Sequence, residues 1–411
     1  MLRLLIWGQF HTHRSRVPVC ANLRGTHGHV AAVAAGSKHI AIVSGEGHIA
    51  LIGSNRHGQI GQPVDTALTH NEMKPYLYEF DYMPDEPRLN AVSCGCNFNI
   101  FYKRHSNFGV VIGSNTYGQL GLGHKDLVDA SQGAPSWIPE ECEFLQKGRK
   151  VADVVCGFNH TFFRMSDGSL WSCGSNTFGE LGMEDGHDFD LISPMAPQRV
   201  TYFERKGIEV VDVKAGNSWS LFLAKDGRVF GCGTFVSGQL TTWARGPVVQ
   251  ALHRQFAASA EVGKVRPLIR IEHIGCLADM ALYVGKSKGG EIFARGSLPD
   301  VGFIEAQHTV VKLSETPVEP LRGIVCGATH ALLVGAEGGP ILGVGDAMEG
   351  QLGPGSTAGV ARDPVQLCPR WLPPSEGHWR DKVAAGHGFS LLAPPFPEEL
   401  RGIREVQWPE V

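Results

Sequence analysis

Short apolar runs that end in glycine recur along the whole chain. They end at Gly36, Gly95, Gly157, Gly216, Gly275, Gly327 and Gly386, in steps of 59, 62, 59, 59, 52 and 59 residues. In the third copy, residues 161–165 are rich in β-forming side chains, and Asp167 and Gly168 then separate them from the alternating run 169–173. Asp-Gly between two such runs is typical of a β-hairpin, since both turn residues favour positive φ. The pattern predicts seven repeats of short antiparallel strands.

A second glycine signature follows in most of the copies. Residues 53–61, 113–121, 174–182 and 345–353 begin and end with glycine and carry Gly-Gln or Gly-Glu near their end, and 233–240 is a shortened form. A repeat of this length is close to that of a four-stranded propeller blade, and seven blades lie within the usual range of ~4–8. We therefore predict an all-β fold over residues 1–393, a seven-bladed β-propeller of four-stranded antiparallel blades.

The two ends of the chain fit together in this prediction. The seventh copy has strand-forming residues at 383–393 and no second half, whereas residues 2–8 form an apolar run without a first half. We expect the N-terminal strand to complete the last blade, because ring closure removes sheet edges that invite aggregation. Residues 394–411 are rich in proline and glutamate and are expected to form a tail over the ring.

Composition excludes several classes of protein. The chain has 52 glycines, 24 prolines and a formal net charge of -4, so there is no basic footprint for nucleic acid. No apolar run approaches the ~20 residues that span a bilayer, so we expect no membrane contact. We separately expect the propeller to be monomeric. Ten cysteines without a Cys-x-x-Cys pair indicate a reducing compartment, the cytoplasm or nucleus.

The composition of the N-terminal region makes the mitochondrion an alternative compartment. Residues 1–45 contain no acidic side chain but several basic ones, a composition typical of a mitochondrial presequence. Against this interpretation, residues 2–8 form a strand that the last blade needs.

The two glycine signatures resemble the repeat of the regulator of chromosome condensation family, in which a Gly-x-x-His element precedes Asn-x-x-Gly-Gln-Leu-Gly. The resemblance covers essentially residues 1–393 and implies the propeller fold. It is a poor guide to function, because one fold hosts unrelated roles. It implies three functions: a protein-binding regulatory or scaffold propeller, a guanine-nucleotide exchange factor for a small Ran-like GTPase, or a mitochondrial assembly factor.

The resemblance allows one of these functions, nucleotide exchange, to be tested against particular residues of the sequence. In the family's exchange factor, acidic residues directly after the repeat glycines are needed. The matching positions here are Ser37-Lys38, Cys96-Asn97, Phe158-Asn159, Asn217-Ser218, Cys276-Leu277, Ala328-Thr329 and His387-Gly388, and none is acidic. Asp279 is the nearest carboxylate, four residues after Gly275. We therefore disfavour a small GTPase as partner.

Catalytic and metal-binding chemistry finds no support in the motifs. There is no His-Glu-x-x-His sequence, and the Gly-x-Ser-x-Gly match at residues 285–289 lies in a predicted blade hairpin, so we expect neither an enzyme nor a cofactor. His39, His160 and His330 each lie three residues after a repeat glycine. We expect each of them to be hydrogen-bonded within its own sheet rather than to bind a metal. The cysteines beside the repeat glycines are interpreted as small buried hydrophobic residues.

What remains is a protein-binding surface. By the resemblance, side chains just after the repeat glycines line one face of the ring, and aromatic residues among polar neighbours are typical interface hot spots. The candidates are Lys38, Asn97, Phe158, Asn159, Asn217, Trp219, Asp279 and His387. The alternative for Phe158 and Trp219 is packing between blades. The long segments 62–89, 123–150 and 241–267 are a second candidate surface, because loops on a rigid scaffold often carry binding sites.

Overall fold

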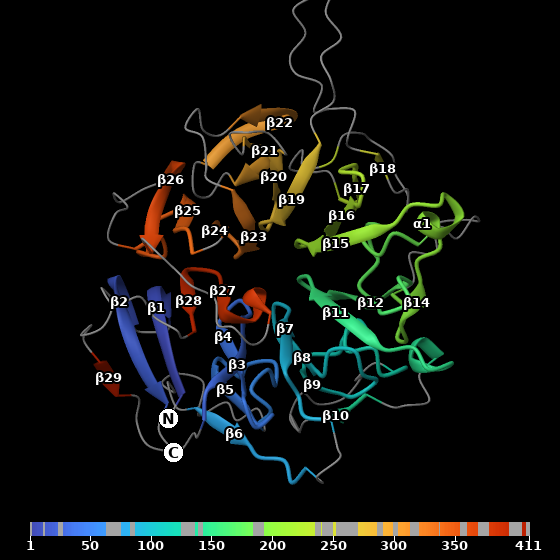
Figure 1. The fold of residues 1–411 in the computed structure, drawn as a ribbon, viewed down its shortest axis with the longest axis horizontal. Helices are drawn as coiled ribbons and strands as arrows, with labels where there is room; N and C mark the ends of the chain where they lie inside the picture. The colour runs from blue at the N-terminus through green and yellow to red at the C-terminus, as the bar shows by residue number, and fades with distance from the viewer. Residues whose placement is uncertain are drawn as a thin grey trace, which may run out of the picture.

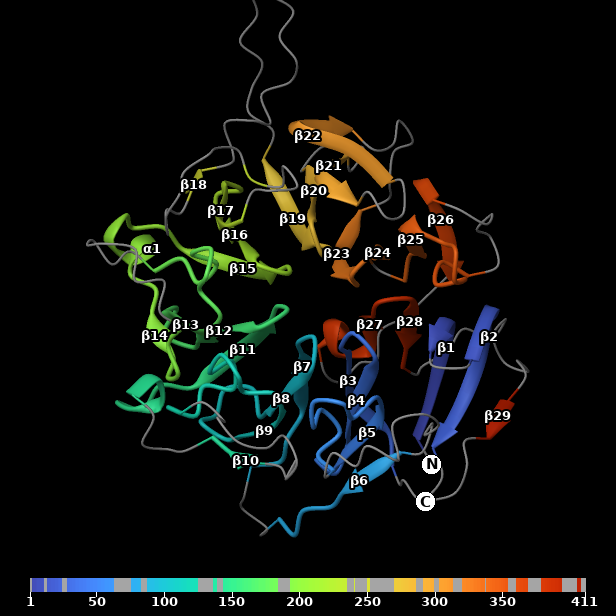
Figure 2. The same ribbon diagram turned by 180° about the vertical axis from the view of Figure 1, so that it is seen from behind.

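The strands of the computed structural model form seven sheets arranged around a centre (Figure 1, and from behind Figure 2). The structure describes residues 2–10, 13–23, 28–62, 75–82, 87–124, 136–138, 143–183, 193–234, 240, 250–251, 270–285, 291–298, 303–312, 320–336, 338–353, 360–368, 378–393 and 405–407. Each sheet is one blade, and the chain winds from one to the next in sequence order. This confirms the predicted propeller.

Six blades have four strands each. Blade 1 contains β3 (Val30–Ala35), β4 (His39–Ser44), β5 (Ile49–Gly53) and β6 (Tyr76–Tyr78); blade 2 contains β7 (Ala91–Cys94), β8 (Phe98–Tyr102), β9 (Gly109–Gly113) and β10 (Ser136–Trp137). Blade 3 contains β11 (Val151–Cys156), β12 (His160–Met165), β13 (Leu170–Gly174) and β14 (Gln198–Arg199); blade 4 contains β15 (Val210–Ala215), β16 (Trp219–Ala224), β17 (Val229–Gly233) and β18 (Gln250–Ala251). Blade 5 contains β19 (Ile271–Cys276), β20 (Met280–Gly285), β21 (Ile292–Leu298) and β22 (Phe303–Lys312); blade 6 contains β23 (Leu321–Cys326), β24 (His330–Gly335), β25 (Ile341–Asp346) and β26 (Val360–Cys368).

Blade 7 joins the two ends of the chain. Its order is β27 (Val383–Ala385), β28 (Phe389–Leu392), β1 (Leu2–Phe10), β2 (His13–Leu23) and β29 (Glu405–Gln407). β1 pairs antiparallel with β28, so the N-terminal strand closes the last blade as expected. β29 pairs parallel with β2 and makes this a five-stranded blade, which differs from the expected four. It covers the edge of β2, and a sheet edge is stabilised by such pairing.

The hydrophobic core lies between neighbouring blades. Phe162 of β12 and Phe222 of β16 meet edge to face, with ring centroids 5.4 Å apart. Phe144, in the short helix η2 (Glu143–Leu145), packs on Phe163 of β12 at 4.7 Å. Trp7 of β1 is fully buried among residues of blades 6 and 7. The Phe162–Phe222 contact joins blades 3 and 4, and Trp7 joins blades 6 and 7, so burial of these side chains holds neighbouring blades together.

The few helices in the described part of the chain are short. They include η2, α1 (Tyr202–Arg205) and η5 (Trp379–Lys382), which directly precedes β27. None of the helices that the structure describes could cross a membrane.

Candidate protein-binding face

The innermost strand of each blade ends in the same tight turn. In blade 3 the backbone N–H of Gly157 donates to the carbonyl oxygen of His160 at 2.8 Å, and in blade 4 Gly216 donates to Trp219 at 2.9 Å. We call the residues after the glycine the first, second and third turn positions. In blade 5 the matching bond runs from Leu277 to Met280 at 2.9 Å. Leu277, and not Gly275, therefore occupies the place of the repeat glycine.

The side chain at the third turn position explains why glycine is needed elsewhere. A Cβ on Gly36 would lie 2.0 Å from Cε1 of His39, and a Cβ on Gly216 would lie 2.2 Å from Nε1 of Trp219. These rings fold back over the turn and leave no room for a side chain. In blade 5 the third position is the flexible Met280, which packs in one core cluster with Leu277. Leucine is therefore tolerated in this blade.

This register corrects one prediction from the sequence. The first and second turn positions of blade 5 are Ala278 and Asp279, not Cys276 and Leu277. Asp279 is thus equivalent to Lys38 of blade 1 and Asn159 of blade 3. The expectation that no turn position carries a carboxylate is wrong for blade 5.

Backbone hydrogen bonds link these turns into a ring. The N–H of Ser37 donates to the carbonyl oxygen of Cys96 in the next blade at 3.2 Å, and Ala278 donates to Ala328 at 2.9 Å. Equivalent bonds join other neighbouring blades: Cys96 to Phe158, Phe158 to Gly216, Asn217 to Ala278 and Ala328 to Gly386. The first turn positions therefore sit on a rigid circle.

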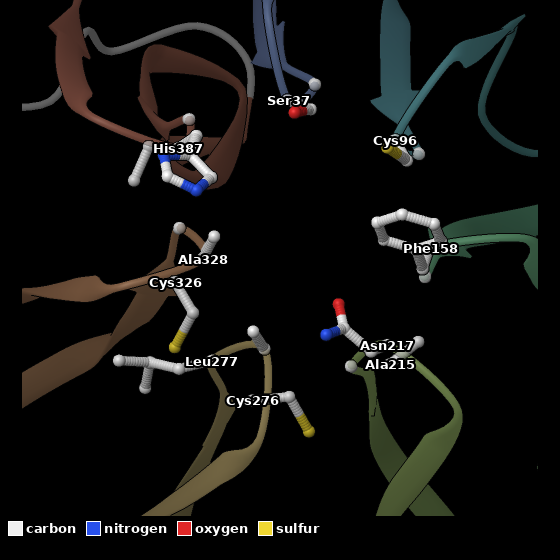
Figure 3. Close-up of a pocket in the computed structure, with 18 of the residues that line it drawn as sticks. Ser37, Cys96, Phe158, Ala215, Asn217, Cys276, Leu277, Cys326, Ala328 and His387 are labelled. Carbon is white, nitrogen blue, oxygen red and sulfur yellow. The ribbon is translucent and has the colours of Figure 1, made fainter. Parts of the chain in front are cut away.

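The circle surrounds the mouth of a central cavity of about 400 Å³. Figure 3 shows Phe158, Asn217 and His387 approaching this space from three different blades. Small residues line it further in, at the position before each repeat glycine or its equivalent: Ala35, Cys94, Cys156, Ala215, Cys276, Cys326 and Ala385. We call the end of the ring that carries the turns the mouth face.

Large apolar side chains are exposed on the mouth face. Phe158 has 43% of its surface exposed, and Tyr117 and Phe178 have 38% and 48%. Tyr117 and Phe178 belong to the second glycine turns, which start at this end because Ser114 donates to the carbonyl of Asn97 and Ser175 to that of Asn159. Met195, which lies beside Gly118 of the blade 2 turn, and Met348 of blade 6 are exposed there too. The remaining exposed large apolar residue of the described chain is Val211, near the opposite end of β15.

The predicted site residues divide into two groups. Lys38, Phe158 and His387 are exposed on the mouth face. Asn97, Asn159, Asn217 and Asp279 are partly exposed beside them.

Trp219 does not belong to this surface. It is fully buried, and its Nε1 donates to the carbonyl oxygen of Ala278 at 2.8 Å. It occupies a third turn position and packs between blades, so it is withdrawn from the candidates. Of the long segments offered as a second surface, most of 241–267 and parts of 62–89 and 123–150 lie outside the described residues.

The three repeat histidines are cross-blade contacts. Nε2 of His160 lies 3.0 Å from Oγ of Ser220, and that of His330 lies 2.9 Å from Oγ of Ser390. Both partners are in the following blade, so the expectation of bonds within one sheet is wrong. Burial lowers the pKa of each of these two imidazoles to about 3. Within the described ranges, no group of three or more His, Cys, Asp or Glu side chains is placed to hold a metal ion.

The closed ring of sheets and the repeated turns define a β-propeller built from glycine-anchored repeats. Profiles of the "Regulator of chromosome condensation (RCC1) repeat" match residues 111–164 and 167–223, and in a second version 151–180. Residues 111–164 and 167–223 therefore match the RCC1 repeat, and the chain resembles the RCC1-like repeat family.

Two curated relatives resemble the chain in sequence, and one solved structure resembles it in fold. The probable E3 ubiquitin-protein ligase HERC6 of Homo sapiens is 27% identical over 303 residues, which are 73% of this chain and 27% of that protein. The secretion-regulating guanine nucleotide exchange factor of Mus musculus is 31% identical over 271 residues, 62% of this chain and 52% of that protein. The crystal structure of human WBSCR16 has a TM-score of 0.72 at 18% identity, covering 96% of this chain and 99% of that chain. The chain thus spans about a quarter to a half of the length of these two relatives.

Proposed function

We propose that this propeller binds another protein through its mouth face and regulates or scaffolds that partner. The observation that carries the proposal is the gathering of exposed Phe158, Tyr117 and Phe178 on one end of a rigid ring. Aromatic side chains of this kind contribute most of the energy of many interfaces. A pre-organised backbone adds to affinity because little conformational entropy is lost on binding.

The polar groups around these rings support a protein partner over a charged ligand. Asn97, Asn159 and Asn217 occupy turn positions of blades 2 to 4, in the same sector of the ring as Phe158, and all are neutral amides. The formal charges of the turn positions lie elsewhere on the circle, at Lys38 in blade 1 and Asp279 in blade 5. A neutral, aromatic sector with amide neighbours fits the apolar centre and polar rim of a protein interface.

Affinity purification from native cells tests the proposal. Tagged wild-type protein is compared with Phe158→Ser, which removes the aromatic ring from the mouth, and with Val211→Ser, which removes an exposed apolar side chain from the other end. We expect a protein that is retained by wild type and Val211→Ser and lost from Phe158→Ser. If Phe158→Ser retains every partner of the wild type, the mouth face is not the binding surface.

A guanine-nucleotide exchange factor for a small GTPase is the second candidate. The specific observation in its favour is that Asp279 occupies a second turn position, beside the mouth. The mouse relative whose name describes such a factor supports it as well. Release of labelled GDP from small GTPases co-purified in nucleotide-free buffer tests this function. Acceleration by wild type but not by Asp279→Asn would favour exchange over scaffolding.

We further propose that the propeller acts as a monomer in the cytoplasm or nucleus. Eight cysteines of the described chain are free thiols, which suits a reducing compartment. Light scattering of the purified protein and microscopy of the tagged chain test the two statements.

A further inference from the structure

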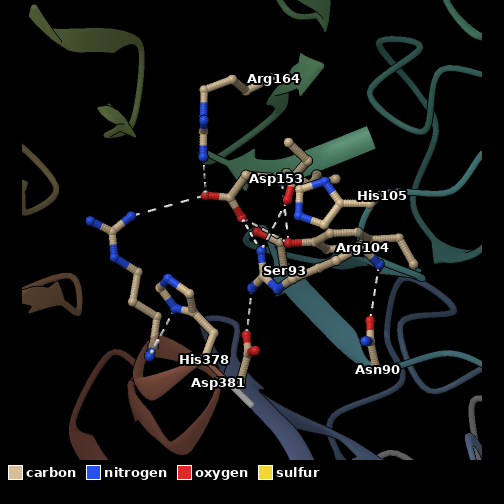
Figure 4. A network of polar contacts seen from close by, with 12 residues as sticks. Asn90, Ser93, Arg104, His105, Asp153, Arg164, His378 and Asp381 are labelled. Carbon is tan, nitrogen blue, oxygen red and sulfur yellow. Dashed lines mark hydrogen bonds and ion pairs between the residues drawn. The ribbon is translucent and has the colours of Figure 1, made fainter. Parts of the chain in front are cut away.

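The end of the ring opposite the mouth is bridged by η5. The guanidinium of Arg380 donates to both carboxylate oxygens of Asp212 in β15, at 3.0 and 2.9 Å. Asp381 accepts a hydrogen bond of 2.7 Å from Arg104, which also donates to Asp153 of β11 at 2.8 Å. Figure 4 shows this network between η5 and the inner strands. One helical turn is therefore tied by charge to blades 2, 3 and 4.

A second cavity, of about 200 Å³, lies between this network and the mouth cavity. The two cavities share residues at one level of the ring: Ala35, Cys94, Cys156, Ala215, Cys276, Cys326 and Ala385. The second cavity, which we call the lower chamber, extends from that level to Arg380 and Lys214. Its other lining groups include Ser93 and short stretches of the inner strands.

The described charges around the lower chamber do not balance. The cations of the network are Arg104, Arg164, Arg380 and Lys214, and its carboxylates are Asp153, Asp212 and Asp381. This network holds four positive and three negative charges, and Lys382 beside Asp381 adds a further positive charge. Of these charged side chains, Arg380 and Lys214 line the lower chamber itself. Lys214 reaches Asp212 only at 3.7 Å, because Arg380 already occupies both oxygens of that carboxylate.

Two further observations concern the excess positive charge around the lower chamber. The Nε atoms of Arg380 and Arg104 are buried donors without a partner among the described residues. Of these two arginines, Arg380 lines the lower chamber. Buried cations are stabilised by an opposite charge and by hydrogen-bond acceptors, so its unpaired donor favours an acceptor with negative charge there. The nearby imidazole of His378 is held neutral, since burial and then the charges of Arg104 and Arg380 lower its pKa to about 4. In its neutral form it adds no further positive charge to the network.

We propose that the lower chamber is a binding site for a small oxyanion of the phosphate class, held by Lys214 and Arg380. Lysine binds phosphate as a point charge and arginine by directed N–H groups. The chamber is smaller than the ~300–1,000 Å³ typical of small-molecule pockets. A free tetrahedral anion fits this scale, whereas a nucleotide does not. The bound anion neutralises the excess positive charge beneath η5. It thereby stabilises the end of the ring opposite the mouth, which η5 bridges.

Thermal unfolding with inorganic phosphate tests the site. Phosphate replaces chloride at constant ionic strength and neutral pH, for wild type, Lys214→Met and Lys225→Met. Lys225 is a matched control because it lies in the same blade but is exposed, paired with Glu209. A ligand that binds only the native state raises the unfolding temperature in a saturable way. We expect this for wild type and Lys225→Met, with at least a tenfold loss of phosphate affinity in Lys214→Met.

Phosphate also stabilises proteins by exclusion from their surface, which affects all variants alike and does not saturate. An equal, non-saturating shift in the three proteins would therefore overturn the proposal. Titration of wild type followed by phosphorus NMR is independent of the folding of Lys214→Met, and the absence of saturable binding there would overturn it too. Acetate is the carboxylate probe. If it binds at least as tightly as phosphate, assignment to the phosphate class is wrong.

Discussion

Nε2 of His160 donates to Oγ of Ser220 across the boundary between blades 3 and 4, over 3.0 Å. The direction follows from the serine, whose own hydroxyl donates to the carbonyl oxygen of Glu180 at 2.8 Å. The two residues are 60 positions apart, which is one repeat. His330 and Ser390 form the same contact between blades 6 and 7, and Ser390 donates to Gln351 in the same way. A side chain at the third turn position thus fastens each of these blades to the next.

Removal of the serine hydroxyl measures the strength of this contact. Ser220→Ala leaves Nε2 of His160 without a partner in a dry interior, and the carbonyl of Glu180 keeps only the weak donor Sγ of Cys232 at 3.3 Å. A buried polar group left unsatisfied costs about 1–3 kcal/mol, so we expect the free energy of unfolding to fall by that amount. Urea denaturation measures it. Ser218→Ala, two residues away and partly exposed, is the control and should change stability by less than about 0.5 kcal/mol. Equal effects of the two variants would contradict the contact.

The buried histidines predict loss of stability in mild acid. Burial lowers the pKa of His39 to about 4 and of His160 and His330 to about 3, from 6.5. Below pH 6.5 the unfolded chain binds protons that the native chain excludes, so the free energy of unfolding falls with pH until the native pKa is reached. Three such groups give a slope of roughly 4 kcal/mol per pH unit. Urea midpoints at pH 7.5, 6.5 and 5.5 test this, and equal midpoints between pH 6.5 and 5.5 would refute it.

One variant isolates the contribution of a single imidazole. His160→Gln removes one titrating group, and we expect the slope between pH 6.5 and 5 to decrease by about 1.4 kcal/mol per pH unit while stability at pH 7.5 also falls. An unchanged slope would mean that other groups cause the acid sensitivity.

Because η5 is held by buried ion pairs, we expect removal of a single charge from it to lower the free energy of unfolding strongly. Arg380→Met leaves the carboxylate of Asp212, whose side chain is 9% exposed, without its bidentate partner. Breaking a buried ion pair costs about 3–5 kcal/mol. We expect a loss near the lower value, since the Arg380 side chain is itself 27% exposed, and partial recovery in Arg380→Met/Asp212→Asn. Arg228→Met breaks a surface pair with Asp226 and should cost less than about 1 kcal/mol. Chemical denaturation distinguishes these outcomes.

The cysteines around the cavity are expected to be unreactive in the native ring. Burial raises the pKa of Cys156 and Cys326 to about 12, and that of Cys94 and Cys276 well above its usual range. Because the thiolate is the reactive form, iodoacetamide at pH 7.5 should leave these four unlabelled and modify them after denaturation. Cys96, partly exposed at the mouth, should react first. Rapid native labelling of Cys156, detected by peptide mass spectrometry, would contradict this expected lack of reactivity.

The sequence predicts the blades well because each blade is made of local strands and turns. It misplaces the fifth turn because Gly275 keeps the regular step of 59 residues while Leu277 holds the turn. The informative signal is at the third position, where methionine replaces a ring. The same position could have identified Trp219 as buried, since His39 and His160 occupy it in other blades.

No local sequence pattern predicts the ion pairs by which η5 bridges the end of the ring opposite the mouth. Arg380 and Asp212 are 168 residues apart, and Arg104 and Asp381 are 277 apart. Their short side-chain contacts depend on ring closure, which brings η5 beneath blades 2 to 4. Neither residue type nor spacing predicts which arginine meets which aspartate.

The affinity of the purified partner for mouth-face variants tests the central claim most directly. Isothermal titration compares wild type, Phe158→Ala and Phe178→Ala with Val211→Ala from the other end of the ring. Truncation of a hot-spot aromatic costs at least about 2 kcal/mol, so we predict a Kd for Phe158→Ala more than tenfold weaker than that of wild type. Val211→Ala should bind as wild type does. If Phe158→Ala and Phe178→Ala both keep the wild-type Kd, the mouth face is not where this propeller binds its partner.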